Sequence, residues 1–495
     1  MLTQEWLLFV PGVLATIVLC GLVGLTLTTL VWFVVDRRQT RHAVRRNFPV
    51  LGRFRYGFEH LGEFFRQYFF AMDREELPFN RAERTWAYRA AKNLDNTGAF
   101  GSTFNNFADG SFFFLNSAFP ALEQQLVAGS PVTIGPQCAH PYVVGRFFHI
   151  SGMSYGAISK PAVQALSRGA AKAGCWLNTG EGGLSPYHLE GECDLVFQIG
   201  TANYGARDSL GALDDDRLAE LAREPRIKMF EIKLSQGAKP GKGGILPAAK
   251  VTPEIARIRG IAPHSDSISP NGRSDARSVG ALLDLVARVR DLTGKPVGIK
   301  ACIGTAAWVE ELCQTVHSRG TASAPDFFTV DSGDGGTGAA PQSLMDHMGM
   351  PIRESLPLVV DILTRHGLHG RVRVIAAGKL VHPARAAWAL AMGADFVVSA
   401  RGFMFALGCI QAMQCNRNTC PTGVTTHDPR LQRGLVPANK AERVAHYANN
   451  VEREVGVIAH ACGVEDPRQL TPDQVRWVTG AGLSQPIRSV HAMRQ

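Results

Sequence analysis

The sequence predicts an α/β protein: a (β/α)8 barrel of the TIM type, preceded by an N-terminal transmembrane helix. Three observations predict this fold. A long apolar run, residues 6–35, opens the chain. Short apolar, β-rich runs then alternate with helical segments, as in a closed parallel barrel. With 45% hydrophobic and 19% charged residues, the 495-residue chain is a packed globular protein and not a disordered one.

The apolar run at residues 6–35 exceeds the roughly 20 residues that a membrane-spanning helix needs. Arginines follow it directly, at residues 37–46, whereas a signal peptide carries its positive charge before the apolar core. Positive charge on the C-terminal side places that side in the cytoplasm. We therefore expect residues 1–36 to be a single-pass anchor in the inner (cytoplasmic) membrane, with the catalytic part of the chain facing the cytoplasm. A buried core helix is the alternative.

Residues 37–95 form a basic and aromatic connecting region that we expect to be helical. Its apolar residues recur at helical spacing, so one face of a helix is apolar. They are Phe58, Leu61, Phe65, Tyr68 and Phe69. Such a stripe favours packing in a core over contact with a membrane surface, which is the alternative.

The predicted barrel strands are mostly continuous apolar runs, as strands buried on both faces should be. They cover residues 147–152, 176–181, 195–200, 229–235, 296–301, 327–331, 373–378 and 396–400. Helices are expected at residues 160–173, 214–223, 305–319 and 383–392. A doubly wound open sheet is the alternative, but the chain lacks G-x-G-x-x-G after its first strand.

Polar residues gather where the predicted strands end. They are Ser154, Glu181, Gln198, Lys233, Lys300, Asp331, Lys379 and Arg401. In barrel enzymes the carboxyl ends of the strands form the catalytic face. A single residue of this kind would be explained by solvation, but one at each strand end predicts an active site there.

Glycines at the last strand ends predict a phosphate cradle. Ala377–Lys379 and Ser399–Gly402 follow the seventh and eighth strands, the usual phosphate site of such barrels. Asp334–Gly338 adds a second glycine turn. A loop carrying Lys233, Lys239, Lys242 and Lys250 should face an anion, with a merely solvated loop as the alternative.

Three closely spaced thiols, Cys409, Cys415 and Cys420, are followed at once by Pro421. No helix or strand places them on one face, so they converge only if the backbone loops round a common centre, as at a metal site. A structural zinc site would want four ligands, and unliganded buried thiols are the other alternative. The net charge of +9 suggests acidic partners, yet no basic face with interleaved aromatics points to nucleic acid.

Five motifs occur in one order along the chain: Gly152–Ser159, Asn178–Gly183, Gln236–Gly241, Asp334–Pro341 and the cysteine segment ending at Cys420–Val424. Together they closely resemble the FMN-binding synthase domain of glutamate synthase. The resemblance covers roughly residues 96–430 and leaves residues 431–495 as a C-terminal helical extension.

This resemblance implies reductive amination of 2-oxoglutarate by ammonia, through 2-iminoglutarate, to L-glutamate. It implies FMN in the barrel and a 3Fe–4S cluster on Cys409, Cys415 and Cys420. Gln236, Lys239 and Arg259 would bind 2-oxoglutarate, with Glu181 as an acid/base or ammonia-orienting group and Lys300 stabilising reduced flavin. The FMN residues would be Met153, Ser154, Gly180, Gln198, Lys300, Asp334, Gly335, Gly336, Gly378, Lys379, Ala400 and Arg401.

The chain departs from that family in three places. An apolar helix stands where the family has a glutaminase domain, the C-terminal β-helix domain is missing, and Ser269–Asp275 replaces a Pro/His-rich stretch. We therefore expect ammonia from outside the chain, from solution or a separate glutaminase subunit. Without an NAD(P)H fingerprint, electrons should come from an external donor protein. A related flavin-barrel transferase acting on glutamate and an amine, and a catalytically silent membrane electron-transfer subunit, are the alternatives.

Overall fold

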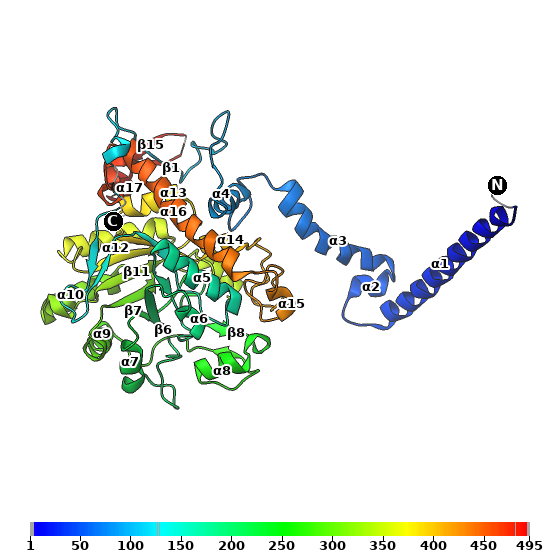
Figure 1. Cartoon of the computed structure of the whole chain (residues 1–495), viewed down its shortest axis with the longest axis horizontal. Helices are drawn as coiled ribbons and strands as arrows, with labels where there is room; N and C mark the ends of the chain where they lie inside the picture. Colours follow the sequence, from blue (N-terminus) through cyan, green and yellow to red (C-terminus); the bar gives the residue numbers. More distant parts are fainter. Residues whose placement is uncertain (1–3, 126, 128, 481, 493–495) are drawn as a thin grey trace. The chain divides into compact units, whose positions relative to one another are not determined.

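The computed structural model describes residues 4–125, 127, 129–480 and 482–492. It divides into two compact units, Met1–Ala82 and Glu83–Gln495. Figure 1 shows the helices of the first unit in blue and the barrel of the second in green and yellow. The two units are described in turn.

The first unit begins with helix α1 (Gln4–Arg38). Its residues Phe9–Arg38 have a hydropathy of 2.3 and bury none of their most apolar window. Length and composition fit a membrane span, and they fit an N-terminal signal sequence equally.

Helices α2 (Ala43–Asn47) and α3 (Leu51–Phe65) follow, and a π-helical turn η1 (Arg66–Phe70) continues α3. The apolar stripe expected on this helix is present. It is exposed among the described residues of this unit, with Phe58 at 69% and Phe69 at 75%, and the expected packing in a core stays a prediction.

The second unit is built on a closed barrel of parallel strands in the order β10-β11-β12-β13-β4-β5-β6-β7. Every predicted strand is confirmed. The strands are β4 (Phe148–Ile150), β5 (Leu177–Asn178), β6 (Leu195–Ile199), β7 (Ile227–Lys233), β10 (Val297–Cys302), β11 (Phe327–Asp331), β12 (Arg373–Ala377) and β13 (Phe396–Ser399). Large buried side chains form a hydrophobic core cluster, among them Trp176, Met229 and Phe396.

Helices follow the strands as the alternating pattern predicts. They are α5 (Lys160–Ala173), α6 (Pro186–Leu189), α7 (Asp215–Ala222), α8 (Pro253–Arg259), α9 (Val279–Thr293), α10 (Ala307–Arg319), α11 (Gln342–His347), α12 (Ile352–Arg365), α13 (Pro383–Ala391) and α14 (Arg401–Leu407). Helix α5 has the predicted bounds because Ser159 accepts a hydrogen bond from Ala162 N and Gly174 ends the helix at φ 70°.

Further elements surround the barrel. Helix α4 (Arg81–Ala91) precedes it, and α15 (Pro429–Gln432), α16 (Pro437–Ala461) and α17 (Ile487–Ala492) follow it. Small antiparallel sheets pair β2 (Val132–Ile134) with β3 (Tyr142–Val144), β8 (Ile245–Leu246) with β9 (Ser267–Ile268), and β1 (Phe112–Phe114) with β14 (Val475–Val478) and β15 (Ser484–Pro486).

The C-terminal segment is therefore not purely helical, because β14 and β15 form a sheet with β1. Its long helix α16 lies alongside α5 (Figure 1). Gly169 on α5 permits the close approach, since a Cβ there would lie 2.5 Å from Val444 Cβ. This helix is an integral layer of the barrel's exterior.

A buried carboxylate holds the N-terminal end of the barrel together. Asp326, which precedes β11, is 0% exposed. Its oxygens accept from Val297 N at 2.9 Å, Arg290 Nε at 3.0 Å and Arg371 Nη1 at 3.1 Å. These contacts tie the starts of two neighbouring strands to two flanking arginines.

Replacing Asp326 by alanine should destabilise the protein strongly. The variant leaves two arginines beside a buried, unpaired backbone amide, and breaking a buried ion pair costs about 3–5 kcal/mol. Urea unfolding followed by circular dichroism measures the change. The matched control is Asp284→Ala, which breaks the exposed pair with Arg319 and should cost below about 1 kcal/mol. Equal effects of the two variants would contradict this role of Asp326.

Candidate active site

Two adjoining cavities open at the carboxyl ends of the barrel strands. The outer one encloses about 880 Å³ and the inner one about 580 Å³, each including some open solvent. Gln198, Lys233, Gln236, Gly336 and Arg401 line both. Of the predicted site residues, all but Asp334, Cys409 and Cys420 line at least one of them.

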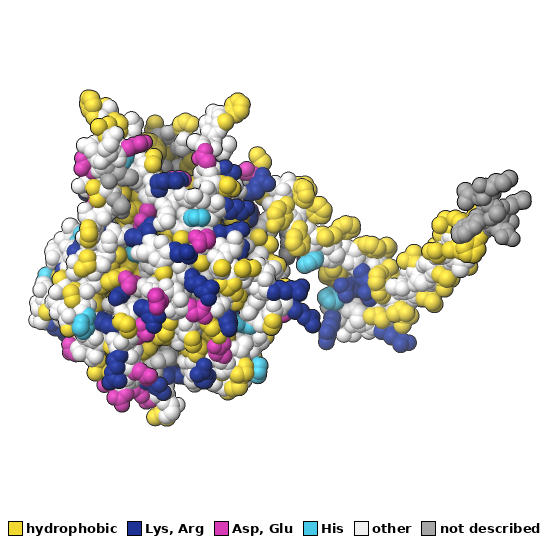
Figure 2. Space-filling model, in the orientation of Figure 1, with side chains coloured by type: hydrophobic (Ala, Val, Ile, Leu, Met, Phe, Trp, Pro, Cys, Tyr) yellow, Lys and Arg dark blue, Asp and Glu magenta, His cyan; other side chains and the backbone are white. Residues whose placement is uncertain are grey.

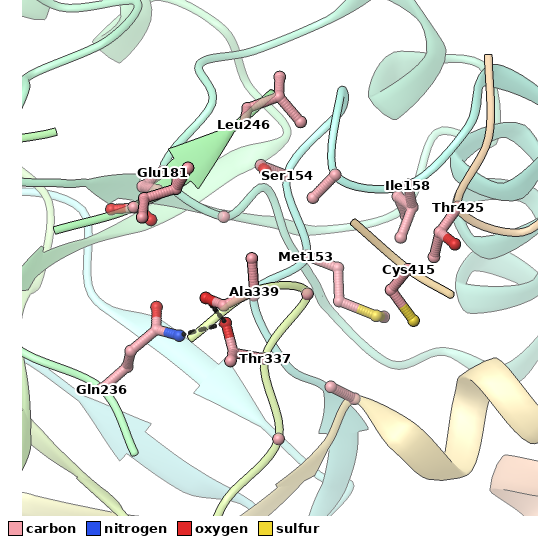
Figure 3. Close-up of a pocket in the computed structure, with 18 of the residues that line it drawn as sticks. Met153, Ser154, Ile158, Glu181, Gln236, Leu246, Thr337, Ala339, Cys415 and Thr425 are labelled. Atoms are coloured by element: carbon pink, nitrogen blue, oxygen red, sulfur yellow. Dashed lines mark hydrogen bonds between the residues drawn. The ribbon is translucent and has the colours of Figure 1, made fainter. Parts of the chain in front are cut away.

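The outer cavity is lined by all three predicted substrate residues, Gln236, Lys239 and Arg259, and by Glu181. Predicted FMN residues line it as well, among them Met153, Ser154, Gly180 and Gln198. Figure 3 shows Glu181 and Gln236 on one side of this cavity, with Met153 and Cys415 on the other. Gln236 Nε2 donates to Thr337 Oγ1 at 3.1 Å, which orients the amide across the cavity.

Glu181 follows β5 and is fixed by a lysine and two glycines. Lys233 Nζ lies 3.1 Å from Glu181 Oε1. A Cβ on Gly200 would lie 2.6 Å from Glu181 Cβ, and one on Gly244 would lie 2.5 Å from Oε1, so both positions need glycine. Burial raises the pKa of Glu181, but the positive charges of Lys233, Lys239 and Arg259 outweigh it and hold the pKa below its usual value. The side chain is a carboxylate at neutral pH.

Lys239 and Arg259 supply buried positive charge to the same cavity. Lys239 is 4% exposed, and its ammonium has no hydrogen-bond partner among the described residues. Burial lowers the pKa of Lys239 to about 8, although Glu181 acts in the opposite direction. Arg259 donates to Tyr155 O at 3.1 Å and to Ser267 Oγ at 3.1 Å, while its Nε is buried without a partner. Unpaired buried cations are costly, so this pair favours an anionic ligand.

The inner cavity combines glycines with cations. It is lined by Gly335, Gly336, Gly378, Lys379, Ala400, Arg401 and Lys300. Gly378 and Lys379 have φ values of 118° and 52°, and a left-handed lysine is uncommon outside functional turns. Asp334 lies outside the lining and binds Lys379 Nζ at 2.9 Å, so it positions a lining residue.

Lys300 enters the inner cavity from β10. Its ammonium lies 3.8 Å from Asp331 Oδ2. Burial alone would lower the pKa of Lys300, but the carboxylates of Asp331, Glu231 and Glu181 outweigh it and raise the pKa above its usual value. A positive charge therefore lines the inner cavity.

Sequence reasoning missed Glu231, which organises the barrel interior. This carboxylate is 2% exposed. It accepts from Asn178 Nδ2 at 2.8 Å, Gln198 Nε2 at 2.7 Å and Thr329 Oγ1 at 2.6 Å, from three different strands. The signal was an acid inside the apolar run of β7, two positions before Lys233.

The three predicted cluster cysteines lie after α14, in a segment with left-handed residues at Gln411, Met413 and Asn418. Cys415 lines the outer cavity and lies 4.0 Å from Arg401 Nη1. Cys409 accepts from Gln411 N at 3.5 Å, and Cys420 lies 3.5 Å from Thr422 Oγ1. In the described part of the chain, no three His, Cys, Asp or Glu side chains lie close enough to hold a metal ion.

Lys250 belongs to the lysine-rich loop expected to face an anion, but its ammonium donates to backbone carbonyls. It is 2% exposed and donates to Ala157 O at 2.7 Å and to Cys415 O at 3.2 Å. Asn418 Nδ2 adds a bond to Ala249 O at 3.1 Å. These hydrogen bonds hold the loop that carries Ala249 and Lys250 against the cysteine segment.

A family model and several known proteins similar to this chain all point to glutamate synthase. Residues 121–465 match the family model described as the conserved region in glutamate synthase. A glutamate synthase large subunit-like protein, YerD of Bacillus subtilis (strain 168), is 36% identical over 92% of this chain and 94% of its own. An archaeal glutamate synthase (NADPH) of Methanocaldococcus jannaschii is 34% identical over 68% of this chain, and the match covers 62% of that relative.

An archaeal-type glutamate synthase (NADPH) of Thermotoga maritima is 32% identical over 67% of this chain and 62% of its own. Among solved structures, a chimera of (S)-mandelate dehydrogenase is similar over 80% of this chain and 99% of that one, at 13% identity and a TM-score of 0.48. That last likeness carries no inference about function. The family match and the curated relatives suffice: the chain belongs to the glutamate synthase family and is a glutamate synthase-like enzyme.

Proposed function

We propose that the protein catalyses the reductive amination of 2-oxoglutarate to L-glutamate, with FMN bound at the barrel mouth and ammonia supplied from outside the chain. One observation carries the proposal. Lys239 and Arg259 bring buried, incompletely paired positive charge to a cavity that also holds the ionised Glu181. This cavity adjoins one lined by glycines and cations.

A dicarboxylate fits the outer cavity chemically. Arg259 has a planar guanidinium suited to one carboxylate, and Lys239 offers a point charge to the other. Gln236 adds an amide between them and the inner cavity. A carboxylate of the substrate would accept hydrogen bonds from the Lys239 ammonium. This pairing stabilises the bound state relative to the empty one.

FMN fits the inner cavity. Gly378, Lys379, Ala400 and Arg401 line it, so that their backbone amides would bind a phosphate and the cations of Lys379 and Arg401 would complement its charge. Close packing supports a cradle, because a Cβ on Gly336 would lie 2.6 Å from Arg401 Nε. Met153, Ser154, Gly180, Gln198, Gly335 and Lys300 would complete the site. When bound, FMN supplies the two electrons that reduce the imine.

The chain's own residues would handle binding and protons. Lys239 and Arg259 fix the keto acid, so that its C2 carbonyl is presented to ammonia. The ammonia nitrogen bonds to C2 and water leaves, giving 2-iminoglutarate. Glu181, ionised and paired with Lys233, orients ammonia and accepts a proton as the C–N bond forms. Lys300 would stabilise negative charge on a flavin reduced in the inner cavity.

We infer that Cys409, Cys415 and Cys420 hold a 3Fe–4S cluster. N–H and O–H donors lie near the sulfurs of Cys409 and Cys420, as is usual for cluster ligands. Cys415 borders the outer cavity, which fits an electron inlet from an external donor protein.

Helix α1 would be a single-pass anchor in the inner membrane, with the barrel in the cytoplasm. A separate glutaminase subunit would be one source of ammonia.

The purified full-length protein should form L-glutamate from 2-oxoglutarate and ammonium when reduced methyl viologen donates electrons. Glu181→Gln should lower kcat by roughly 10²–10⁴-fold, because general acid–base catalysis contributes that much. Its KM for 2-oxoglutarate should change little. Glu190→Gln, which alters a carboxylate paired with Arg168, is the control and should keep full activity. No glutamate from the unaltered protein would overturn the proposed reaction.

Binding of 2-oxoglutarate should weaken as the pH rises through about 8, because Lys239 then loses the positive charge that attracts the anion. The charged form is present below that pH, so binding is strongest there. Lys239→Gln should weaken binding roughly 30-fold, about 2 kcal/mol for a lost charged contact, and remove this pH dependence. Isothermal titration calorimetry measures both. Lys242→Gln in the same loop, where the side chain is exposed, should retain the dependence.

Cys415→Ser should lower the iron bound per chain and remove the cluster's EPR signal, because one of three ligands loses its thiolate. Iron analysis and EPR spectroscopy of the anaerobically purified protein measure this. Cys462→Ser, at the end of α16, should leave both unchanged. Unchanged iron in Cys415→Ser would show that the cluster assignment is wrong.

A further inference from the structure

Helix α3 and the turn η1 present a broad apolar face that no described residue of their unit covers. The residues of this face recur three or four positions apart, so they point in one direction. Their exposed fractions are 57% for Phe54, 69% for Phe58, 47% for Leu61, 46% for Phe65 and 75% for Phe69. A contiguous apolar face of this kind marks an interaction surface.

The opposite face of α3 is held against the end of α1. Asp36, in the last turn of α1, accepts from Arg53 Nε and Nη2, each at 2.8 Å, and from Val50 N at 3.1 Å. The Arg53 guanidinium also lies 4.8 Å from the centre of the Trp32 ring. These contacts place α3 where the apolar helix ends and turn its apolar face away from that junction.

Helix α2 strengthens the same junction. The guanidinium of Arg45 lies 4.8 Å from the centre of the Tyr56 ring, and a Cβ on Gly52 would lie 2.9 Å from Arg45 Cα. The approach of α2 to α3 is therefore close, and it needs glycine at position 52. The orientation of the apolar face is set by packing and by a buried ion pair, since Asp36 is 1% exposed.

The junction is rich in positive charge. Figure 2 shows dark-blue side chains gathered between the hydrophobic surfaces of α1 and α3, and residues 1–82 contain arginine but no lysine. The arginines of the segments that form the junction include Arg37, Arg38, Arg41, Arg45, Arg46 and Arg55, and Arg66 follows at the other end of α3. Basic residues close to a bilayer are attracted to anionic headgroups by about 1 kcal/mol each.

We propose that α3 and η1 bind the cytoplasmic surface of the bilayer in which α1 is anchored. Phe54, Phe58, Leu61, Phe65 and Phe69 would lie at the boundary of headgroups and acyl chains, with the arginines on anionic headgroups. The inference rests on the proposed anchor. Continuity with the end of α1 and complementary charge favour lipid over a protein partner, which would need an acidic surface beside an apolar one.

Photo-crosslinking in the full-length protein tests this surface. The benzophenone amino acid p-benzoylphenylalanine replaces Phe58 or Phe65 on the apolar face, Glu59 as the control beside it, or Leu22 within α1. Each variant is reconstituted in vesicles of phosphatidylglycerol and phosphatidylethanolamine, irradiated, and analysed by mass spectrometry. We expect lipid adducts at Phe58, Phe65 and Leu22, and none above background at Glu59.

Other outcomes separate the two claims. Lipid adducts at Leu22 combined with none at Phe58 and Phe65, or with adducts to protein there, overturn the bilayer-surface proposal and leave the anchor standing. Absence of lipid adducts at Leu22 overturns the anchor, and the surface proposal with it. In vesicles of phosphatidylcholine alone, the adduct yield at Phe58 should fall; an unchanged yield overturns the role of anionic headgroups.

Discussion

The geometry of the active-site cavities depends on one buried carboxylate, that of Glu231. A buried charge without partners costs several kcal/mol, so the fold must bring donors to it. Here β5, β6 and β11 each supply one, through Asn178, Gln198 and Thr329. The same negative charge helps to keep Lys300 protonated on β10. The floor of the site is therefore set by electrostatics that span the barrel.

The two ends of the barrel use buried charge for different purposes. At the N-terminal end, Asp326 is surrounded by donors and pairs with both arginines, which closes that end. At the other end, Lys239 and the Nε of Arg259 are buried with their hydrogen-bonding capacity incompletely used. Stability thus resides at one end and binding at the other, as is general for barrels of this type.

Much of this architecture could be predicted because parallel barrel strands are buried on both faces. Continuous apolar runs located every strand, even β5, which has only Leu177–Asn178 as regular strand. Polar residues at the strand ends then located the cavities, and all the predicted substrate residues line one of them.

What could not be predicted depends on partners distant in sequence. In the sequence, Glu231 is an isolated acid within an apolar strand. Only the fold brings Asn178 and Thr329 close enough to donate hydrogen bonds to it. Lys250 belongs to a loop expected to face an anion, yet its ammonium binds the carbonyls of Ala157 and Cys415. The stripe on α3 had correct periodicity, but periodicity reports an apolar face and not what covers it.

Gly200 and Gly244 have a consequence for how such a site can diversify. Because the backbone confines Glu181 from two sides, a new specificity is accessible mainly through side chains that line the same cavity, such as Ile245 and Leu246 next to Gly244.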